Sequence, residues 1–193
     1  MRLNGALIIV GFLGTAVMAH ASSFVIDNFS CSDSVSLTGL GSTFGMVSSC
    51  PGSIGGSRSD LIAVSGGSGD SVSTIDSNPP TGAITGSFGS GLSGSDILTW
   101  FGSTTPGVLD LPNLDLSGDS ILVPIKSGSG GTLTVYLKSG STNSSNRLAY
   151  SVTFSASSSF VDELIPLTDP TILGTGANVD DVTGIGLDVT MPT

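Results

Sequence analysis

Residues 132–139 alternate between aliphatic and polar side chains, and this stretch constrains the fold more than any other. It reads TLTVYLKS, so Leu133, Val135 and Leu137 are separated by hydroxyl, aromatic and basic residues. Side chains on a β-strand point to opposite faces in turn. One face of this segment is therefore aliphatic and the other polar, which predicts a strand buried on one side.

The segment just before it completes a predicted β-hairpin. Residues 120–126 (SILVPIK) lead through the five-residue link 127–131 (SGSGG) into residues 132–139. A glycine-containing connection of this length between two strand-like runs is typical of a hairpin. Pro124 has no N–H to donate to a ladder, so we expect the first arm to lie at a sheet edge or to carry a bulge there.

The rest of the chain favours an all-β domain. Glu occurs once in 193 residues and Gly 28 times, a composition that disfavours helices and suits strands joined by turns. About nine strand-like segments follow one another along the chain, from residues 24–29 (FVIDNF) to residues 182–190 (VTGIGLDVT). We predict a jelly-roll-like antiparallel β-sandwich in which the first and last strands pair.

The first 21 residues predict a cleaved signal peptide. Arg2 provides a positive charge, residues 3–18 are apolar, and Ala19-His20-Ala21 fits a cleavage motif, with Ser22 as the new N-terminus. The alternative is a membrane anchor, but the apolar run is short for a spanning helix. We therefore expect a signal peptide at 1–21 and a single β-sandwich domain at 22–193, secreted or held at the cell surface.

Charge limits the partners of the mature chain. The net charge of −10 becomes −11 when Arg2 leaves with the leader. The remaining basic residues form no run, so nucleic acid is not an expected partner. After the leader no apolar stretch reaches spanning length, so no transmembrane segment is expected in the mature chain. Four basic residues remain: Arg58, Lys126, Lys138 and Arg147.

Cys31 and Cys50 are the two cysteines of the chain. An even pair in an exported protein predicts a disulfide, and two free thiols are the alternative. The bridge would close a loop of about 20 residues and contribute roughly 3 kcal/mol in the chain-entropy model.

Several short motifs resemble, in their order, one family of exported proteins. They are IDNFS (26–30), GGSRSD (55–60), LTW (98–100), LTV (133–135) and DDVTGIGL (180–187). The chain resembles secreted bacterial ectodomains that precede Pro-Glu-Pro C-terminal sorting tails, and more distantly jelly-roll carbohydrate-binding modules. The Pro-Glu-Pro motif itself is absent from this sequence. The resemblance implies export, a sandwich fold, association with the cell surface or exopolysaccharide, and no catalytic residues.

Most catalytic arrangements are excluded by composition. Loss of His20 with the leader removes the Ser-His-Asp triad and histidine metal sites. A disulfide removes thiol catalysis. The acidic pairs Asp162–Glu163 and Asp180–Asp181 are sequence neighbours, which point to opposite faces on a strand and do not form the converging pair of a glycosidase. We therefore expect a protein that is not an enzyme.

Calcium is the one metal ion that the composition suggests. Ca²⁺ takes oxygen ligands. Asp27 in the first strand and Asp188 in the last would approach each other if those strands pair, so we consider a structural Ca²⁺ at this place. The alternative is that both are solvated surface carboxylates.

Sugar binding usually needs an exposed aromatic side chain, and three residues are considered. Tyr150 alternates with Val152 and Phe154, which predicts a core position. Trp100 lies within a strand and is a weaker candidate, because a lone Trp in a sandwich is commonly buried. Tyr136 points away from the aliphatic face of its strand and is the best exposed candidate.

The sequence is compatible with two functions. The first is a non-catalytic exported surface or extracellular-matrix protein whose partners are other matrix proteins. The second is a carbohydrate-binding module for extracellular polysaccharide, with or without structural calcium. A binding module predicts two or more exposed aromatic side chains on one sheet face, whereas a matrix protein predicts polar faces and an available edge strand.

Overall fold

A computed structural model describes residues 7–9, 24–27, 29, 31–67, 72–78, 83–88, 91–103, 105, 108–141 and 146–191. Its regular structure is almost entirely β, with one short 3-10 turn at Ile54–Gly56. The strands are β1 Leu7–Ile9, β2 Phe24–Asp27, β3 Asp33–Thr38, β4 Gly41–Ser48, β5 Ser57–Gly67, β6 Val72–Asn78, β7 Ala83–Ser87, β8 Leu92–Trp100, β9 Ser120–Ile125, β10 Gly131–Lys138, β11 Arg147–Phe154, β12 Val161–Pro166, β13 Thr171–Leu173 and β14 Gly184–Met191.

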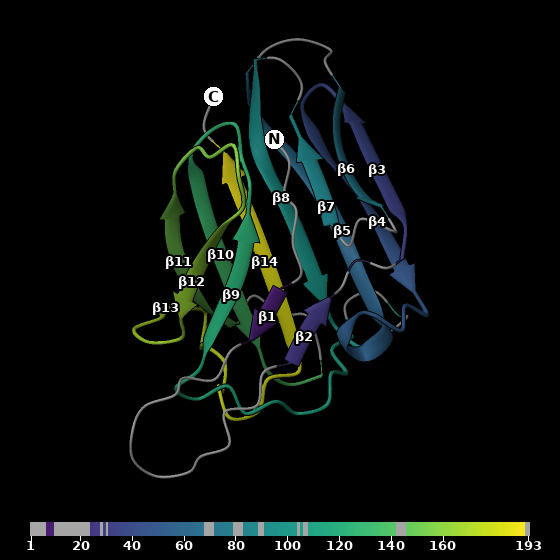
Figure 1. Ribbon diagram of the computed structural model, residues 1–193. Helices are drawn as coiled ribbons and strands as arrows, with labels where there is room; N and C mark the ends of the chain where they lie inside the picture. The colour runs from purple at the N-terminus through teal and green to yellow at the C-terminus, as the bar shows by residue number, and fades with distance from the viewer. Residues whose placement is uncertain are drawn as a thin grey trace.

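The strands form one large sheet and two small ones. The large sheet has the order β13–β11–β10–β14–β8–β5–β4. The small sheets have the orders β12–β9–β1–β2 and β3–β6–β7, and both lie on the same side of the large sheet (Figure 1). Every strand pair in the described chain is antiparallel. The prediction of a jelly-roll-like antiparallel β-sandwich is confirmed.

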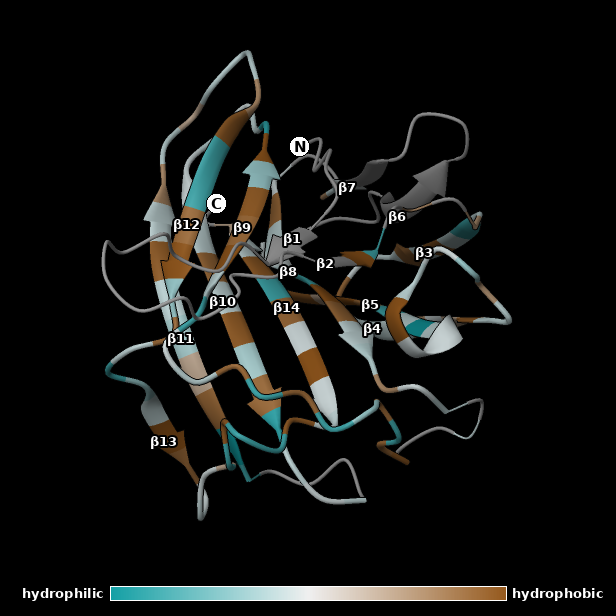
Figure 2. Ribbon diagram, turned by 60° about the horizontal axis from the view of Figure 1, so that its bottom comes forward, coloured by the Kyte–Doolittle hydropathy of each residue, from teal (hydrophilic) through white to brown (hydrophobic). Residues whose placement is uncertain are grey.

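Alternation in the sequence determines which side chains enter the core. Leu133, Val135 and Leu137 of β10 are fully buried, and the intervening residues point away from the core. The neighbouring strands follow the same rule, and apolar and paler bands alternate along β10 and β14 in Figure 2. This is the predicted pattern of a strand with one buried face.

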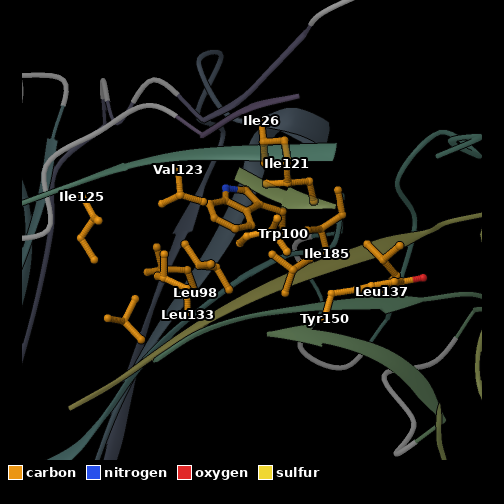
Figure 3. Packing of buried hydrophobic residues seen from close by; sticks show 14 of the residues in the cluster. Ile26, Leu98, Trp100, Ile121, Val123, Ile125, Leu133, Leu137, Tyr150 and Ile185 are labelled. Atoms are coloured by element: carbon orange, nitrogen blue, oxygen red, sulfur yellow. The ribbon is translucent and has the colours of Figure 1, made fainter. Parts of the chain in front are cut away.

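The core lies between the large sheet and the two small sheets. Trp100 of β8 is fully buried, and Figure 3 shows it among Ile26, Ile121 and Val123 from the opposite layer. Tyr150 is also buried, as its alternation with Val152 and Phe154 predicts. The buried cluster comprises Ile26, Phe29, Val35, Ile62, Val64, Leu92, Leu98, Trp100, Leu111, Leu116, Ile121, Val123, Ile125, Leu133, Val135, Leu137, Leu148, Tyr150, Phe154, Ile165, Leu167, Val182, Ile185, Leu187 and Val189.

The predicted hairpin at residues 120–139 is wrong, although both of its strands exist. β9 pairs with β12 and β1, whereas β10 pairs with β11 and β14. The link therefore carries the chain from one layer to the other. The physical reason is that Ile121, Val123 and Ile125 bury one face of β9 against the core from the opposite side, which satisfies the same apolar pattern as a hairpin would.

Two further expectations about strand order need correction. β2 pairs with β1, and β14 lies between β10 and β8, so the first and last predicted strands do not pair. β2 belongs to the other layer, where its Asp27 side chain turns inward. β9 was expected at a sheet edge because of Pro124, but it lies between β12 and β1. On one side Pro124 is opposite Asp162 of β12. On the other side β1 pairs only with Ile121 and Leu122, so its ladder does not extend to Pro124.

The predicted leader is described only at β1. This strand pairs with β2 and β9 at the same time. Ala21 and Ser22, the predicted cleavage position, lie outside the described residues, so cleavage stays a prediction. Within the described residues there is no helix with the length and apolar character that a membrane span requires.

The predicted disulfide is confirmed. Cys31 and Cys50 are bonded, with a Cα–Cα distance of 5.8 Å. They flank β3 and β4, which belong to different sheets and are joined by a tight turn at Gly39 and Leu40. The bond therefore ties the two layers together at the open end of this connection.

Candidate functional site

The polar side of the large sheet is the candidate site, and we call it the outer face. It consists of the side chains of the large sheet that point away from the core. Strand register places these side chains in rows that run across the sheet. On the four strands β11, β10, β14 and β8 they are Arg147, Ala149, Ser151, Thr153, Thr132, Thr134, Tyr136, Lys138, Gly186, Asp188, Thr190, Ser95, Ile97 and Thr99.

Tyr136 is held between a glycine and an arginine on this face. Gly186 is its partner on β14, and a Cβ at Gly186 would lie 3.5 Å from the Tyr136 Cβ and 3.6 Å from Cδ2. On β11, the guanidinium carbon of Arg147 lies 4.3 Å from the Tyr136 ring centroid. Burial and the nearby Asp188 raise the pKa of Tyr136, and Arg147 opposes that rise. Tyr136 is therefore a half-buried support for Arg147 rather than an open ring.

Hydroxyl groups next to Tyr136 are linked across strands. Thr134 and Ser151 share a hydrogen bond of 2.8 Å, and Ser95 and Thr190 share one of 3.1 Å. The Thr190 hydroxyl donates to the Asp188 carboxylate at 3.2 Å. These contacts give the centre of the outer face several oriented donors and acceptors of the kind that bind sugar hydroxyls.

The outer face becomes apolar toward β4. Asp188 is opposite Ile97, Ile97 is opposite Leu61, and Leu61 is opposite Phe44. The Phe44 side chain is 63% exposed. Since neighbouring strands are about 4.8 Å apart, Phe44 on β4 and Tyr136 on β10 are separated by roughly 19 Å across the sheet. The outer face thus carries aromatic side chains toward both of its sides.

Sequence reasoning missed Phe44. It lies in residues 30–57, which are rich in Gly and Ser and show no regular alternation of apolar residues. The signal that was available is local: Thr43-Phe44-Gly45-Met46-Val47 contains the β-prone residues of an edge strand. Apolar and polar residues need not alternate strictly in β4, because β4 is the edge strand of the large sheet.

A pair of basic residues lies at the end of the β10–β11 ladder. Leu137 pairs with Leu148, so Lys138 and Arg147, the next residues outward, are opposite each other. Lys138 is 6% exposed, and burial together with Arg147 lowers its pKa to about 8. Arg147 Nε is buried and has no hydrogen-bond partner in the described chain.

Trp100 has no exposed ring face. It is fully buried, and its indole N–H donates to Asp27 Oδ2 at 2.8 Å. Tyr136 and Trp100 are therefore not brought together. Of these two sequence candidates, Tyr136 lies on a surface and Trp100 belongs to the core.

Asp27 is part of a buried charge network that the sequence analysis did not anticipate. Arg58 Nη1 donates to Asp27 Oδ2 at 2.7 Å, and Arg58 Nε donates to Asp60 Oδ1 at 2.6 Å. Arg58 also lies over the Phe29 ring at 5.1 Å. Burial raises the pKa of Asp60 to about 6, and Arg58 opposes that rise. Strand alternation could have revealed this network in the sequence. Residues 58 and 60 lie on the same strand face as Ile62, so both charged side chains point inward.

The two aspartates considered for calcium lie apart. Asp27 is in the core beneath Arg58 and Trp100, whereas Asp188 is on the outer face. Burial raises the pKa of Asp188, and hydrogen bonds from Ser95 and Thr190 oppose this. In the described ranges no group of three or more His, Cys, Asp or Glu residues could hold a metal ion.

Asp96 of β8 is a buried carboxyl group with no hydrogen-bond partner at either oxygen in the described chain. Its side chain is directed toward the β3–β6–β7 sheet, where a Cβ at Gly86 would overlap the carboxyl group. Burial raises the pKa of Asp96 to about 7, and Asp188 and Asp60 contribute to the rise.

Comparison with known proteins gives two loosely similar structures. The family 11 carbohydrate-binding module of the cellulosomal cellulase Lic26A-Cel5E of Clostridium thermocellum has a TM-score of 0.38 and 14% identity, over 96% of this chain and 85% of that one. A family 11 module from Clostridium thermocellum, in complex with a β-1,3-1,4-mixed-linked tetrasaccharide, has a TM-score of 0.33 and 13% identity, over 95% and 86%. No protein-family model and no curated protein matches.

Proposed function

We propose that this protein is a non-catalytic carbohydrate-binding module, and that a polysaccharide chain lies across the strands of its outer face. The proposal rests on one observation above all. A single sheet face carries an exposed aromatic side chain, Phe44, and the Tyr136–Arg147 stack, with oriented hydroxyls and Asp188 between them.

This arrangement suits a sugar chain in chemical terms. A sugar ring presents apolar C–H groups on its faces and hydroxyls around its rim, so it needs apolar surface and hydrogen-bonding groups side by side. The Phe44–Leu61–Ile97 row provides the apolar part. Thr134, Ser151 and Asp188 provide the polar part. A face of strands that is already paired is rigid, so little ordering accompanies binding.

Action outside the cytoplasm is part of the proposal. The Cys31–Cys50 bond is of a kind that persists in oxidising compartments, where extracellular polysaccharides are also found. The predicted signal peptide points the same way.

The test is binding to a glycan array followed by affinity measurement on the best ligand. We expect Phe44→Ala to weaken binding by about fivefold, because it removes an aromatic contact worth roughly 1 kcal/mol. Tyr136→Ala should also weaken binding, because Arg147 loses the ring that supports it. Phe160→Ala is the matched control, since Phe160 is 48% exposed but lies beside β12 in the other layer. Equal affinity for all three variants and the wild type would rule out the outer face.

A second candidate is a matrix protein that associates through its sheet edges. It is favoured by exposed apolar residues at two edge strands: Val161 and Leu164 of β12, with Phe160 beside it, and Ile172 of β13. Sedimentation of the wild type and of Leu164→Lys would test it. This candidate fails if both remain monomers at high concentration.

A further inference from the structure

The basic pair on the outer face suggests which class of glycan is bound. Lys138 and Arg147 are two of the four basic residues in the predicted mature chain. Arg58, a third, is buried between two carboxylates. Lys126 follows β9 in the other layer. Within the described residues the outer face is therefore the place where two positive charges lie together on an otherwise acidic protein.

Arg147 differs from Arg58 in its partners. Arg58 forms ion pairs with Asp27 and Asp60. Arg147 forms none with the described residues, and its Nε has no hydrogen-bond partner there. The guanidinium carbon lies over the Tyr136 ring, which leaves the edges of the guanidinium to other partners. A stacked guanidinium keeps its N–H groups in the plane, where they match the two oxygens of a carboxylate or sulfate.

Lys138 adds a second charge at the same position. Its side chain is nearly buried at the end of β10, opposite Gly184 of β14. A Cβ at Gly184 would lie 2.7 Å from Leu109 Cδ2, so the 101–118 connection packs against this end of the sheet. An anion held here would be partly shielded from water, and a shielded charge pair is stronger than an exposed one.

Resting on the proposed carbohydrate-binding function, we infer that the ligand is an acidic polysaccharide. The anionic group of one sugar, a carboxylate or a sulfate ester, is bound by the Arg147 fork with Lys138 beside it. Tyr136 is a positioning residue that orients the guanidinium. The sugar that follows extends over Thr134 and Ser151, and its hydroxyls can donate to the Asp188 carboxylate.

The net negative charge of the protein does not contradict this. Charges more than a Debye length apart, about 8 Å at physiological ionic strength, are largely screened. The anion therefore responds mainly to nearby groups, and the Arg147 guanidinium over Tyr136 is the group that would contact it.

The test compares three probes by titration calorimetry: polygalacturonate for carboxylates, dextran sulfate for sulfate esters, and a neutral mixed-linked glucan. We expect at least one anionic probe to bind more tightly than the glucan, and its affinity to fall as salt rises from about 50 to about 300 mM. Arg147→Gln should weaken that binding by about tenfold or more, and Arg147→Lys less, because lysine keeps the charge but loses the fork. Lys126→Gln, the matched loss of one charge in the other layer, should have no effect.

Each result has a defined consequence. If Phe44→Ala weakens binding of the neutral glucan while Arg147→Gln changes no affinity, the proposed function stands and the acidic ligand is wrong. If the wild type binds neither anionic probe, the acidic ligand is wrong, and if it also binds no glycan on the array, the proposed function is wrong as well. Thermal unfolding of every variant confirms that lost binding is not lost folding, and Arg147→Lys serves as the conservative variant if Arg147→Gln unfolds.

Discussion

At the scale of single residues, the interior of this sandwich contains ionisable side chains both with and without hydrogen-bond partners. Arg58 is satisfied by two carboxylates at once, and Trp100 donates to one of them. Such a buried network favours one arrangement of the strands, because any other register would leave a buried charge unpaired. Asp96 has no such partner in the described chain.

The Asp96 carboxyl group predicts a pH dependence of stability. Its folded pKa of about 7 lies above its ordinary value, so its contribution to stability is complete at low pH and is lost as pH rises toward 7. For wild type we expect the free energy of unfolding to fall by on the order of 2 kcal/mol between about pH 5 and pH 8.

Asp96→Asn should remove the Asp96 part of that dependence, because the amide has the same shape and does not ionise. A smaller part should remain, because the pKa of Asp60 is also raised, to about 6. Urea unfolding at several pH values measures it. Asp162→Asn is the control, since Asp162 is exposed on β12 in the other layer. A pH profile of Asp96→Asn parallel to that of the wild type would contradict this role of Asp96.

Residue positions were predictable where a side chain obeys strand alternation. Tyr150 and Leu133 were assigned to the core from alternation alone. Arg58 and Phe44 were not, for opposite reasons. Arg58 points inward despite its charge because carboxylates from two strands meet it there. Phe44 points outward despite its apolar side chain, in a segment whose composition resembles a loop.

At the scale of elements, the connections decide the architecture more than the strands do. Residues 127–131 have the length and glycine content of a hairpin turn, yet they cross between layers. A hairpin and a crossing bury the same apolar faces, so the local sequence does not distinguish them. The distinction comes from β12 and β14, which lie more than 20 residues away and pair with β9 and β10.

The β3–β4 connection gives the element-scale prediction. It is another crossing between layers, and Cys31–Cys50 closes its open end. Reduction, or Cys31→Ser with Cys50→Ser, should lower the free energy of unfolding by roughly 3 kcal/mol, because it frees a loop of about 20 residues in the unfolded chain.

Hydrogen exchange locates the effect of losing the bond. We expect faster exchange in β3 and β4 and unchanged protection in β10 and β11, whose partners are far from the bond. Uniform loss of protection in all four strands would show that the disulfide supports the whole sandwich rather than this connection.

At the scale of the whole molecule, the two layers of the sandwich have different roles. The two small sheets cover the core, and the large sheet presents its other side as the outer face. The sandwich class was predictable, since composition and strand spacing require only that apolar faces meet. The proposed binding face was not, because its rows join residues from positions 44 to 188 that only strand register brings together.

The most direct test of the central claim is a footprint of bound glycan on the protein. Amide chemical shifts, or backbone hydrogen exchange, are measured with and without the best array ligand. If the glycan lies on the outer face, changes should be concentrated at Phe44, Ile97, Thr134, Tyr136, Arg147 and Asp188. Changes confined to residues 160–166 at the β12 edge, with the outer face unaffected, would contradict the central claim.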